Sequence, residues 1–168
     1  MAPDNSAALG TDVDHGVDSM TGSCLCGGIT VTVRQQGLFE KPAGHTCHCA
    51  NCRKMSSSAF MSLLMIRTSD LDMSDPKSLL RIYGDNNSTS GRTVLRPFCS
   101  ECGSPTAATS ESEPRLSFVA LGLFPKTPKP EFELFTAHRQ DWAKPLTTAE
   151  TQYLFADEVL QYKDRMLQ

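Results

Sequence analysis

Three cysteines, a histidine and two cations lie within eight residues, in the stretch "CHCANCRK" (47–54). Thiolates are soft ligands that suit zinc, and four of them close a tetrahedral site. Cys47, Cys49 and Cys52 supply three of the four. A zinc ion held by three protein ligands keeps a fourth position for water or substrate, which is the pattern of catalytic zinc sites. The spacing therefore indicates either an open catalytic site or a structural site that another residue completes.

The other four cysteines form two pairs. Cys24 and Cys26 make a CxC that is followed by two glycines, and Cys99 and Cys102 make a CxxC that is followed by Gly103. Short spacers let both sulfurs of a pair reach one metal ion, and glycine tolerates the left-handed backbone that closes such a turn. Together the two pairs could form a four-cysteine structural zinc site. The triad of the "CHCANCRK" stretch would then stay open.

Histidine offers a closed alternative for the triad. A site of three cysteines and one histidine could use His48, His45 or His138. His48 could also move a proton or orient a ligand, although its place between two ligands favours a ring that points away from the metal. For His45 and His138 we expect hydrogen bonds to the backbone or to solvent. Trp142 could form the wall of a pocket, but we favour packing at the end of the domain.

The charge of the proposed open site favours a particular chemistry. Zinc with three thiolates and a neutral water carries one net negative charge, which makes it a weaker Lewis acid than zinc held by three histidines. Such a site suits an incoming substrate thiolate, or the alkoxide of a thiohemiacetal, better than water activation. Arg53 and Lys54 could offset the negative charge or bind a substrate carboxylate, or they could form a solvated pair.

The length and charge of the chain limit the classes of protein to which it can belong. The chain has 168 residues, enough for one domain with its own core, and carries 16 basic and 19 acidic residues. That balance argues against a nucleic-acid partner, and no apolar run approaches the ~20 residues of a membrane span. No pattern of a secretory signal begins the chain, so we expect a reducing, cytoplasmic setting in which the cysteines bind metal. A homo-oligomer is compatible with all of this.

Composition divides the chain into three parts. Residues 1–21 contain four aspartates and no lysine or arginine, which predicts a disordered acidic tail. Residues 22–146 form the expected zinc domain, mainly β because short β-branched or apolar runs alternate with turn-rich segments. Residues 147–168 have an apolar helical period, with Thr147 or Thr148 available as the N-cap, and predict a C-terminal helix. The predicted strands are 29–33, 59–66, 79–83, 92–98, 116–124 and 132–137.

Four motifs resemble those of the glutathione-dependent formaldehyde-activating enzyme family, whose relatives include centromere protein V-like proteins. They are "GSCLCGGI", "CHCANCRK", "GRTVLRPFCSECGSP" and "HRQDW", and they cover about residues 22–146. The resemblance implies an Mss4-like layered β-sheet fold that holds two zinc ions. It implies that Cys24, Cys26, Cys99 and Cys102 bind a structural zinc and that Cys47, Cys49 and Cys52 bind a catalytic zinc.

The resemblance also implies an activity. It predicts a zinc-dependent carbon–sulfur lyase or synthase acting on an adduct of the S-hydroxymethylglutathione type. From their residue types and their places beside the cysteines, Arg53 and His48 are the candidate substrate-binding residues. The chain departs from the family at "GLFP" (122–125) and in its extension beyond Trp142. Those departures favour, as an alternative, a similar enzyme that acts on a non-glutathione metabolite in a specialised biosynthetic pathway. A further alternative is a non-catalytic, zinc-stabilised binding module.

Overall fold

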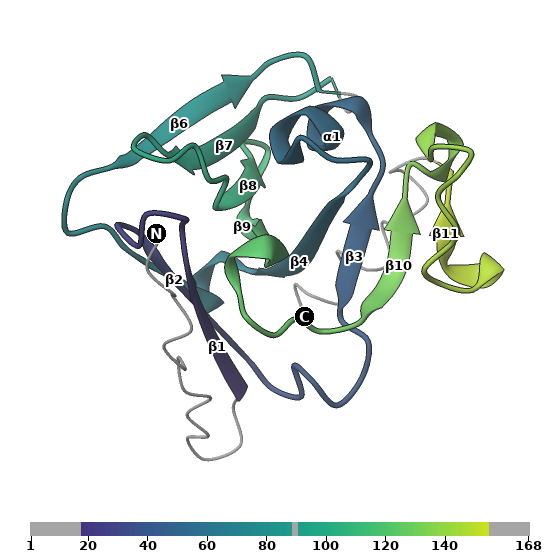
Figure 1. The fold of residues 1–168 in the computed structure, drawn as a ribbon, viewed down its shortest axis with the longest axis horizontal. Helices are drawn as coiled ribbons and strands as arrows, with labels where there is room; N and C mark the ends of the chain where they lie inside the picture. The colour runs from purple at the N-terminus through teal and green to yellow at the C-terminus, as the bar shows by residue number, and fades with distance from the viewer. Residues whose placement is uncertain (1–17, 89–90, 155–168) are drawn as a thin grey trace, which may run out of the picture.

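The computed structural model describes residues 18–88 and 91–154 (Figure 1). Its elements, in chain order, are β1 (Asp18–Ser23), β2 (Thr30–Gln35), β3 (Gly44–Cys47), α1 (Ala50–Ser56), β4 (Met61–Arg67), η1 (Thr68–Asp70), β5 (Leu71–Ser74), β6 (Leu80–Asp85), β7 (Val94–Cys99), β8 (Ala107–Ser110), β9 (Glu113–Ala120), η2 (Leu121–Leu123), β10 (Pro130–Leu134), η3 (Thr136–His138), η4 (Ala149–Thr151) and β11 (Gln152–Tyr153). No helix within the described ranges is long and apolar enough to cross a membrane.

The strands form two sheets. A small antiparallel sheet has the order β1-β2-β5, and a larger one has the order β11-β10-β3-β4-β9-β8-β7-β6. In the larger sheet β10 runs parallel to both neighbours, β3 and β11, while the remaining pairs are antiparallel. Figure 1 shows β6 and β7 at one end of this sheet, β11 at the other, and the β1–β2 pair beside it. The mainly β, layered fold that the sequence predicted is confirmed.

Strand β4 is the shared wall of two cores. Met61, Leu63 and Met65 pack into a cluster that contains Cys47, Cys49 and Cys52, whereas Leu64 and Ile66 pack into a second cluster between the two sheets. Since neighbouring side chains of a strand point to opposite faces, a strand that is buried on both faces needs an almost continuous apolar sequence. The run "AFMSLLMI" meets that need. Full burial of each such side chain contributes about 1.5–3 kcal/mol.

The second core joins the small sheet to the large one. Met20 and Val31 from the small sheet, with Ile66 and Val119 from the large sheet, are buried in one cluster, to which Cys24 and Cys99 also belong. The turns that carry these two cysteines therefore meet at the end of a packed interface.

The folded part of the chain begins earlier than predicted, with strand β1. We expected the tail to reach residue 21, but β1 begins at Asp18 and pairs with β2 along its whole length. Its sequence, "DSMTGS", is polar and carries no strand signal of its own. Pairing with the β-branched β2 and burial of Met20 stabilise it. Residues 1–17 lie outside the described residues.

The predicted C-terminal helix is wrong at its beginning. Residues 149–151 form a single 3₁₀ turn, and Gln152 and Tyr153 then pair with β10 as β11. Thr148 makes no side-chain cap, and Thr147 instead contacts Glu133. Tertiary pairing with β10 overrides the helical period at this point. Residues 155–168, the remainder of the predicted helix, lie outside the described residues.

Candidate metal and substrate site

The two cysteine pairs meet in space. The sulfurs of Cys24, Cys26, Cys99 and Cys102 all lie within 4.8 Å of one another. The Sγ–Sγ distance is 3.5 Å between Cys24 and Cys26, and 3.7 Å between Cys26 and Cys99. Zinc–sulfur bonds of about 2.3 Å in a tetrahedron place neighbouring sulfurs about 3.8 Å apart. The four residues of this cluster, called the cysteine tetrad below, therefore fit a zinc ion.

Two tight turns position the tetrad. Gly27 has φ 72° and donates its backbone N–H to the carbonyl of Cys24 at 2.8 Å; Gly103 has φ 75° and donates to the carbonyl of Cys99 at 2.8 Å. Both backbone conformations are left-handed, which explains glycine after each pair. The N–H of Ile29 also points at the Cys24 sulfur, 3.2 Å away. Such N–H groups stabilise thiolate ligands.

Cys47, Cys49 and Cys52 form a second group, called the cysteine triad. Their sulfurs lie within 4.8 Å of one another, and all three residues are buried, with exposed fractions of 4%, 8% and 7%. No histidine, aspartate or glutamate within residues 18–88 and 91–154 joins the group. The closed alternative with His45, His48 or His138 is therefore not formed by these residues. The triad fits a metal ion that is held by three thiolates.

A helix that the sequence did not predict positions the triad. Cys47 ends β3, Cys49 is the N-cap of α1, and Cys52 lies in the first turn. The Cys52 N–H donates to the Cys49 sulfur at 3.3 Å. Hydrogen bonds from the Cys47 and Cys52 thiols, together with the backbone N–H groups of Cys52 and Asn51, lower the pKa of the Cys49 thiol, although burial acts to raise it. "CANCRKMS" lacks a helical apolar period, which explains why α1 was missed.

A buried ion pair lies beside the triad. Arg96 donates from Nε and Nη2 to Asp85 Oδ2, both at 2.8 Å, and Asn51 donates to the same oxygen at 2.7 Å. Asn51 precedes Cys52 in α1, so the pair connects the triad helix to β6 and β7. A hydrogen bond with Cys47 lowers the pKa of Cys52, but one with Cys49, together with burial, raises it to about 12. The charge of Arg96 also acts to lower it.

Sequence reasoning placed the counter-charge on Arg53 and Lys54 and did not single out Arg96. A signal was present, because Arg96 lies inside a predicted strand, and a charged residue in a buried strand needs a partner. Its partner, Asp85, lies 11 residues earlier at the end of β6, and could not be chosen without the register of β6 and β7.

The two histidines near the triad face other groups. His48 is 1% exposed, and its Nε2 lies 2.9 Å from Glu133 Oε2. Its ring thus contacts a carboxylate, and neither nitrogen joins the triad group. His45 is stacked on Phe132, with ring centroids 4.9 Å apart, and burial lowers its pKa to about 3. Its Nδ1 has no partner among the described residues, so the expected hydrogen bond is not made at this nitrogen. His138 is exposed.

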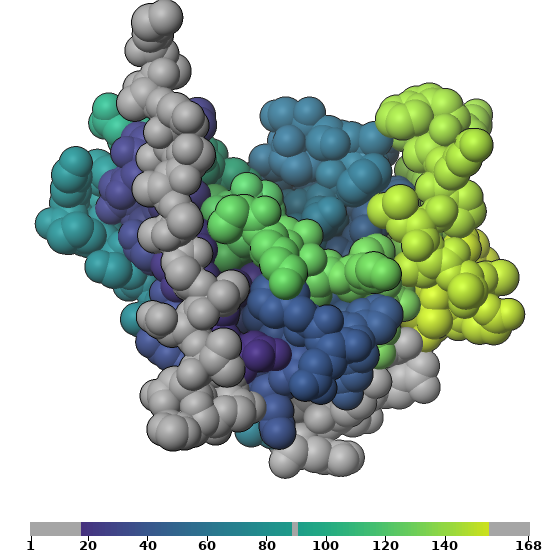
Figure 2. All heavy atoms as spheres, turned by 60° about the horizontal axis from the view of Figure 1, so that its bottom comes forward, coloured from purple at the N-terminus to yellow at the C-terminus, as the bar shows by residue number. Residues whose placement is uncertain are grey.

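An open hollow of about 520 Å³ lies against the face of α1 that carries Ala50, Arg53, Lys54 and Ser57. Figure 2 shows a notch between the blue atoms of the α1 region and the yellow-green atoms near residue 140. Trp142 is 74% exposed and lines the hollow, so the favoured packing role for this residue is wrong. Arg53 is partly buried, and its Nε has no partner among the described residues. The lining residues are Ala50, Arg53, Lys54, Ser57, Ser58, Ala59, Gln140 and Trp142.

The hollow is positive in character. Its lining residues include two cations and no carboxylate, and the sulfurs of the triad do not line it. Arg53 follows Cys52 directly in the helix, but neighbouring helical residues point about 100° apart, so Arg53 and Cys52 lie on different faces of α1.

The chain was compared with known protein families, curated proteins and solved structures. The model of the glutathione-dependent formaldehyde-activating enzyme family matches residues 19–138, which include all seven cysteines. A crystal structure of a Rhodobacter sphaeroides protein, a structural-genomics target, is 21% identical. It covers 80% of this chain and 99% of its own, with a TM-score of 0.49. The comparison with curated proteins gave no match. Gln140 and Trp142 lie beyond the matched residues.

Proposed function

Because the chain belongs to the glutathione-dependent formaldehyde-activating enzyme family, we propose that it is a zinc-dependent carbon–sulfur lyase or synthase. Its substrate would be an adduct between a small thiol and a carbonyl compound, of the S-hydroxymethylglutathione type. The observation that carries the proposal is the triad, three buried sulfurs that no fourth ligand joins within the described residues. The complete tetrad supports a division of labour between a structural and a catalytic metal.

Each residue group has a role in this proposal. Cys24, Cys26, Cys99 and Cys102 would hold the structural zinc, and Cys47, Cys49 and Cys52 would hold the second. A zinc ion at the triad would supply a soft Lewis acid that favours a substrate thiolate. In the synthetic direction the thiol sulfur bonds to the carbonyl carbon and the thiol proton ends on the carbonyl oxygen. The reverse direction breaks the same carbon–sulfur bond, and neither direction needs an oxidant or reductant.

The protein would contribute orientation and a dry environment. The triad is more than nine-tenths buried among apolar side chains, so water has little access to the reacting atoms. Arg53 offers a planar pair of donors that suits a carboxylate, and Lys54 adds a second cation at the same hollow. Arg96 is held near the triad by its ion pair with Asp85, whose carboxylate offsets part of the arginine charge. Free cysteines throughout the chain fit a reducing compartment, for which we propose the cytoplasm.

The decisive experiment measures the rate of thiohemiacetal formation and breakdown with zinc-loaded protein. Glutathione with formaldehyde is the first substrate pair, and Cys49→Ser is the matched variant. We expect acceleration by the native protein, and loss of acceleration with one zinc fewer in a folded variant. If no thiol and aldehyde pair reacts faster with the zinc-loaded protein, the enzyme proposal is wrong. Two bound zinc ions without activity would instead favour a zinc-stabilised binding module.

Substitution of Arg53 tests the role of the hollow. Since a hydrogen bond to a charged group contributes about 1.5–3 kcal/mol, we expect Arg53→Gln to raise KM for glutathione about tenfold or more. Lys54→Gln, the matched control, removes a point charge that is more exposed and should change KM less. Neither change should affect an uncharged thiol such as 2-mercaptoethanol. Equal effects on both thiols would show that the hollow does not bind a carboxylate.

A non-glutathione metabolite is a second candidate substrate. The observation that favours it is the hollow, whose wall includes the side chains of Gln140 and Trp142. An aromatic side chain that is 74% exposed at such a wall can stack on a flat substrate group. Substrate profiling with varied thiols and aldehydes distinguishes the two candidates.

A further inference from the structure

Glu133 is a fully buried carboxylate next to the triad, and sequence reasoning did not single it out. It lies on β10, where it pairs with Thr46 of β3, while its neighbour Leu134 pairs with Cys47. Burial of an unpaired carboxylate costs several kcal/mol, so a position like this requires compensating contacts. The contacts of Glu133 connect two regions of the proposed active site.

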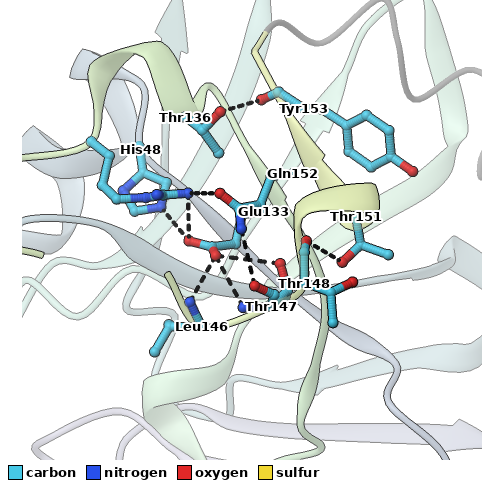
Figure 3. A network of polar contacts seen from close by, with 10 residues as sticks. His48, Glu133, Thr136, Leu146, Thr147, Thr148, Thr151, Gln152 and Tyr153 are labelled. Atoms are coloured by element: carbon cyan, nitrogen blue, oxygen red, sulfur yellow. Dashed lines mark hydrogen bonds and ion pairs between the residues drawn. The ribbon is translucent and has the colours of Figure 1, made fainter. Parts of the chain in front are cut away.

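One carboxylate oxygen of Glu133 binds the end of a loop. Oε1 accepts the backbone N–H of Leu146 at 2.8 Å and of Thr147 at 3.1 Å, and the Thr147 hydroxyl at 3.3 Å (Figure 3). The other oxygen, Oε2, lies 3.5 Å from Arg139 Nη2, at the start of the same loop. Residues 139–147, called the Trp142 loop, are thus held at both ends by one side chain.

Gln152 completes the closure of this loop. Its Oε1 accepts from Arg139 Nη2 at 2.6 Å, and its Nε2 donates to the Thr147 carbonyl at 3.0 Å. Within the loop, the N–H of Ala143 donates to the Gln140 carbonyl at 2.9 Å. Gln140 and Trp142, which line the hollow, therefore lie on a short loop whose ends are fixed and whose middle is exposed.

The same carboxylate also contacts the triad turn. Oε2 lies 2.9 Å from His48 Nε2, and His48 is the residue between the ligand candidates Cys47 and Cys49. The His48 N–H donates to the Leu134 carbonyl at 3.0 Å, so both backbone and side chain of His48 are fixed on β10. Although burial disfavours the charge, hydrogen bonds from His48 and from the Leu146 and Thr147 N–H groups keep the pKa of Glu133 below its usual value.

We propose that Glu133 is a positioning residue that fixes the Trp142 loop and the cysteine triad relative to each other. The wall of the hollow and the turn between Cys47 and Cys49 then share one anchor. If the proposed substrate binds between Arg53 and Trp142, Glu133 also holds one wall of its binding site. The last statement rests on the proposed function, whereas the positional role does not.

The experiment uses Glu133→Gln in the full chain and reads two signals that need no substrate. Trp142 is the only tryptophan, so fluorescence anisotropy reports the motion of its loop. Cobalt bound in place of zinc reports sulfur geometry, and subtraction of the cobalt spectrum of Cys49→Ser isolates the triad. The variant replaces an acceptor oxygen by an amide that cannot accept from all its present donors. We expect faster motion of Trp142 and an altered triad spectrum.

Kinetics and controls complete the test. With glutathione and formaldehyde, KM should rise about tenfold while kcat changes less, since a misplaced wall weakens binding first. Glu113→Gln, which removes a carboxylate paired with exposed Arg115, should change neither signal. Arg139→Gln should loosen Trp142 but leave the cobalt spectrum unchanged, because the His48 contact stays.

A folded Glu133→Gln variant with native anisotropy and a native cobalt spectrum overturns the proposal, even if it is less stable. If that variant does not fold, Arg139→Gln decides: unchanged Trp142 motion overturns the proposal. Altered spectroscopic signals in a protein that lacks all activity would support the positioning role while the proposed function fails.

Discussion

The tetrad and the triad differ in an unexpected direction. The tetrad has a full set of four thiolate candidates, yet Cys26 is exposed and Cys102 is partly exposed. The triad has three, and each of its residues is more than nine-tenths buried. Burial alone therefore does not distinguish the complete set of ligand candidates from the incomplete one. Ligand number and surroundings have to be considered together.

The surroundings explain the difference. Two glycine turns bring the tetrad together at the end of the interface between the sheets, where four bonds to one ion would suffice to hold it. The triad instead lies within a core cluster that includes Phe132, Leu134 and Phe135. If the triad holds a metal ion with one position left for a substrate, as proposed, the apolar side chains around it would exclude other ligands.

Loss of a tetrad sulfur should have the largest effect. Cys99→Ser would remove a ligand candidate that joins the turn after β1 to the turn after β7, and it lies in the packed core. We expect a loss of more than about 4 kcal/mol in the free energy of unfolding, since folding is coupled to metal binding. Chemical denaturation with metal analysis measures it. The matched variant Cys52→Ser should stay folded with one metal ion; equal unfolding by both variants would remove the distinction between the sites.

Loss of the buried Asp85–Arg96 ion pair should lower the stability of the protein by an intermediate amount. It should weaken metal binding at the triad more than at the tetrad. Arg96→Met leaves Asp85 buried without its cation, which costs about 3–5 kcal/mol. Since Asn51 of α1 shares the same carboxylate oxygen, we expect weaker metal retention at the triad than at the tetrad. Competition with a chromophoric chelator would show which metal leaves first. The double variant Asp85→Asn with Arg96→Met should recover part of the stability, and no recovery would mean that the pair is not the cause.

Mild acidification should lower the stability of the protein less than either substitution above. Its effect should come from carboxylates near the triad. The two buried carboxylates among the described residues, Asp85 and Glu133, both contact residues next to triad cysteines. Hydrogen bonds and cations outweigh burial and keep both pKa values below their usual range. Their stabilisation is therefore complete above the unfolded pKa values, about 4 for such groups, and is lost as pH falls toward the lower folded values.

Unfolding measured by denaturant from pH 7 to pH 3 tests this. The native protein should lose stability steadily below about pH 5, and Asp85→Asn should be less stable at pH 7 but show a flatter profile. A profile of Asp85→Asn with the native slope would mean that Asp85 does not contribute.

Much of the fold could be predicted from local patterns. Strands β2, β4, β6, β7, β9 and β10 overlap predicted strands, because β-branched and apolar runs bounded by turn residues are strong local signals. Strands β1, β3, β5, β8 and β11 carry weaker signals. For instance, "GHTC" becomes β3 because it lies between β10 and β4 and is buried along its length. Such strands are defined by their partners, which sequence patterns do not reveal.

The candidate site shows the same division. Spacing and glycines predicted both groups of sulfurs that the structure brings together, whereas their roles as zinc ligands remain predictions. Arg96, Asp85 and Glu133 were not singled out, since their partners lie on other elements, 11 residues away for the Arg96–Asp85 pair and 85 for the His48–Glu133 pair. The hollow could not be predicted either, because it forms between α1 and a loop about 85 residues later (Figure 2).

The double burial of β4 has a consequence for how the protein opens. A strand that contributes side chains to both cores cannot leave one core without exposing the other. Its backbone N–H groups, paired with β3 on one side and β9 on the other, should therefore exchange with solvent deuterium only when the whole domain unfolds. The two cysteine groups would then belong to one cooperative unit. Whatever weakens the tetrad lowers the same global barrier that protects the triad.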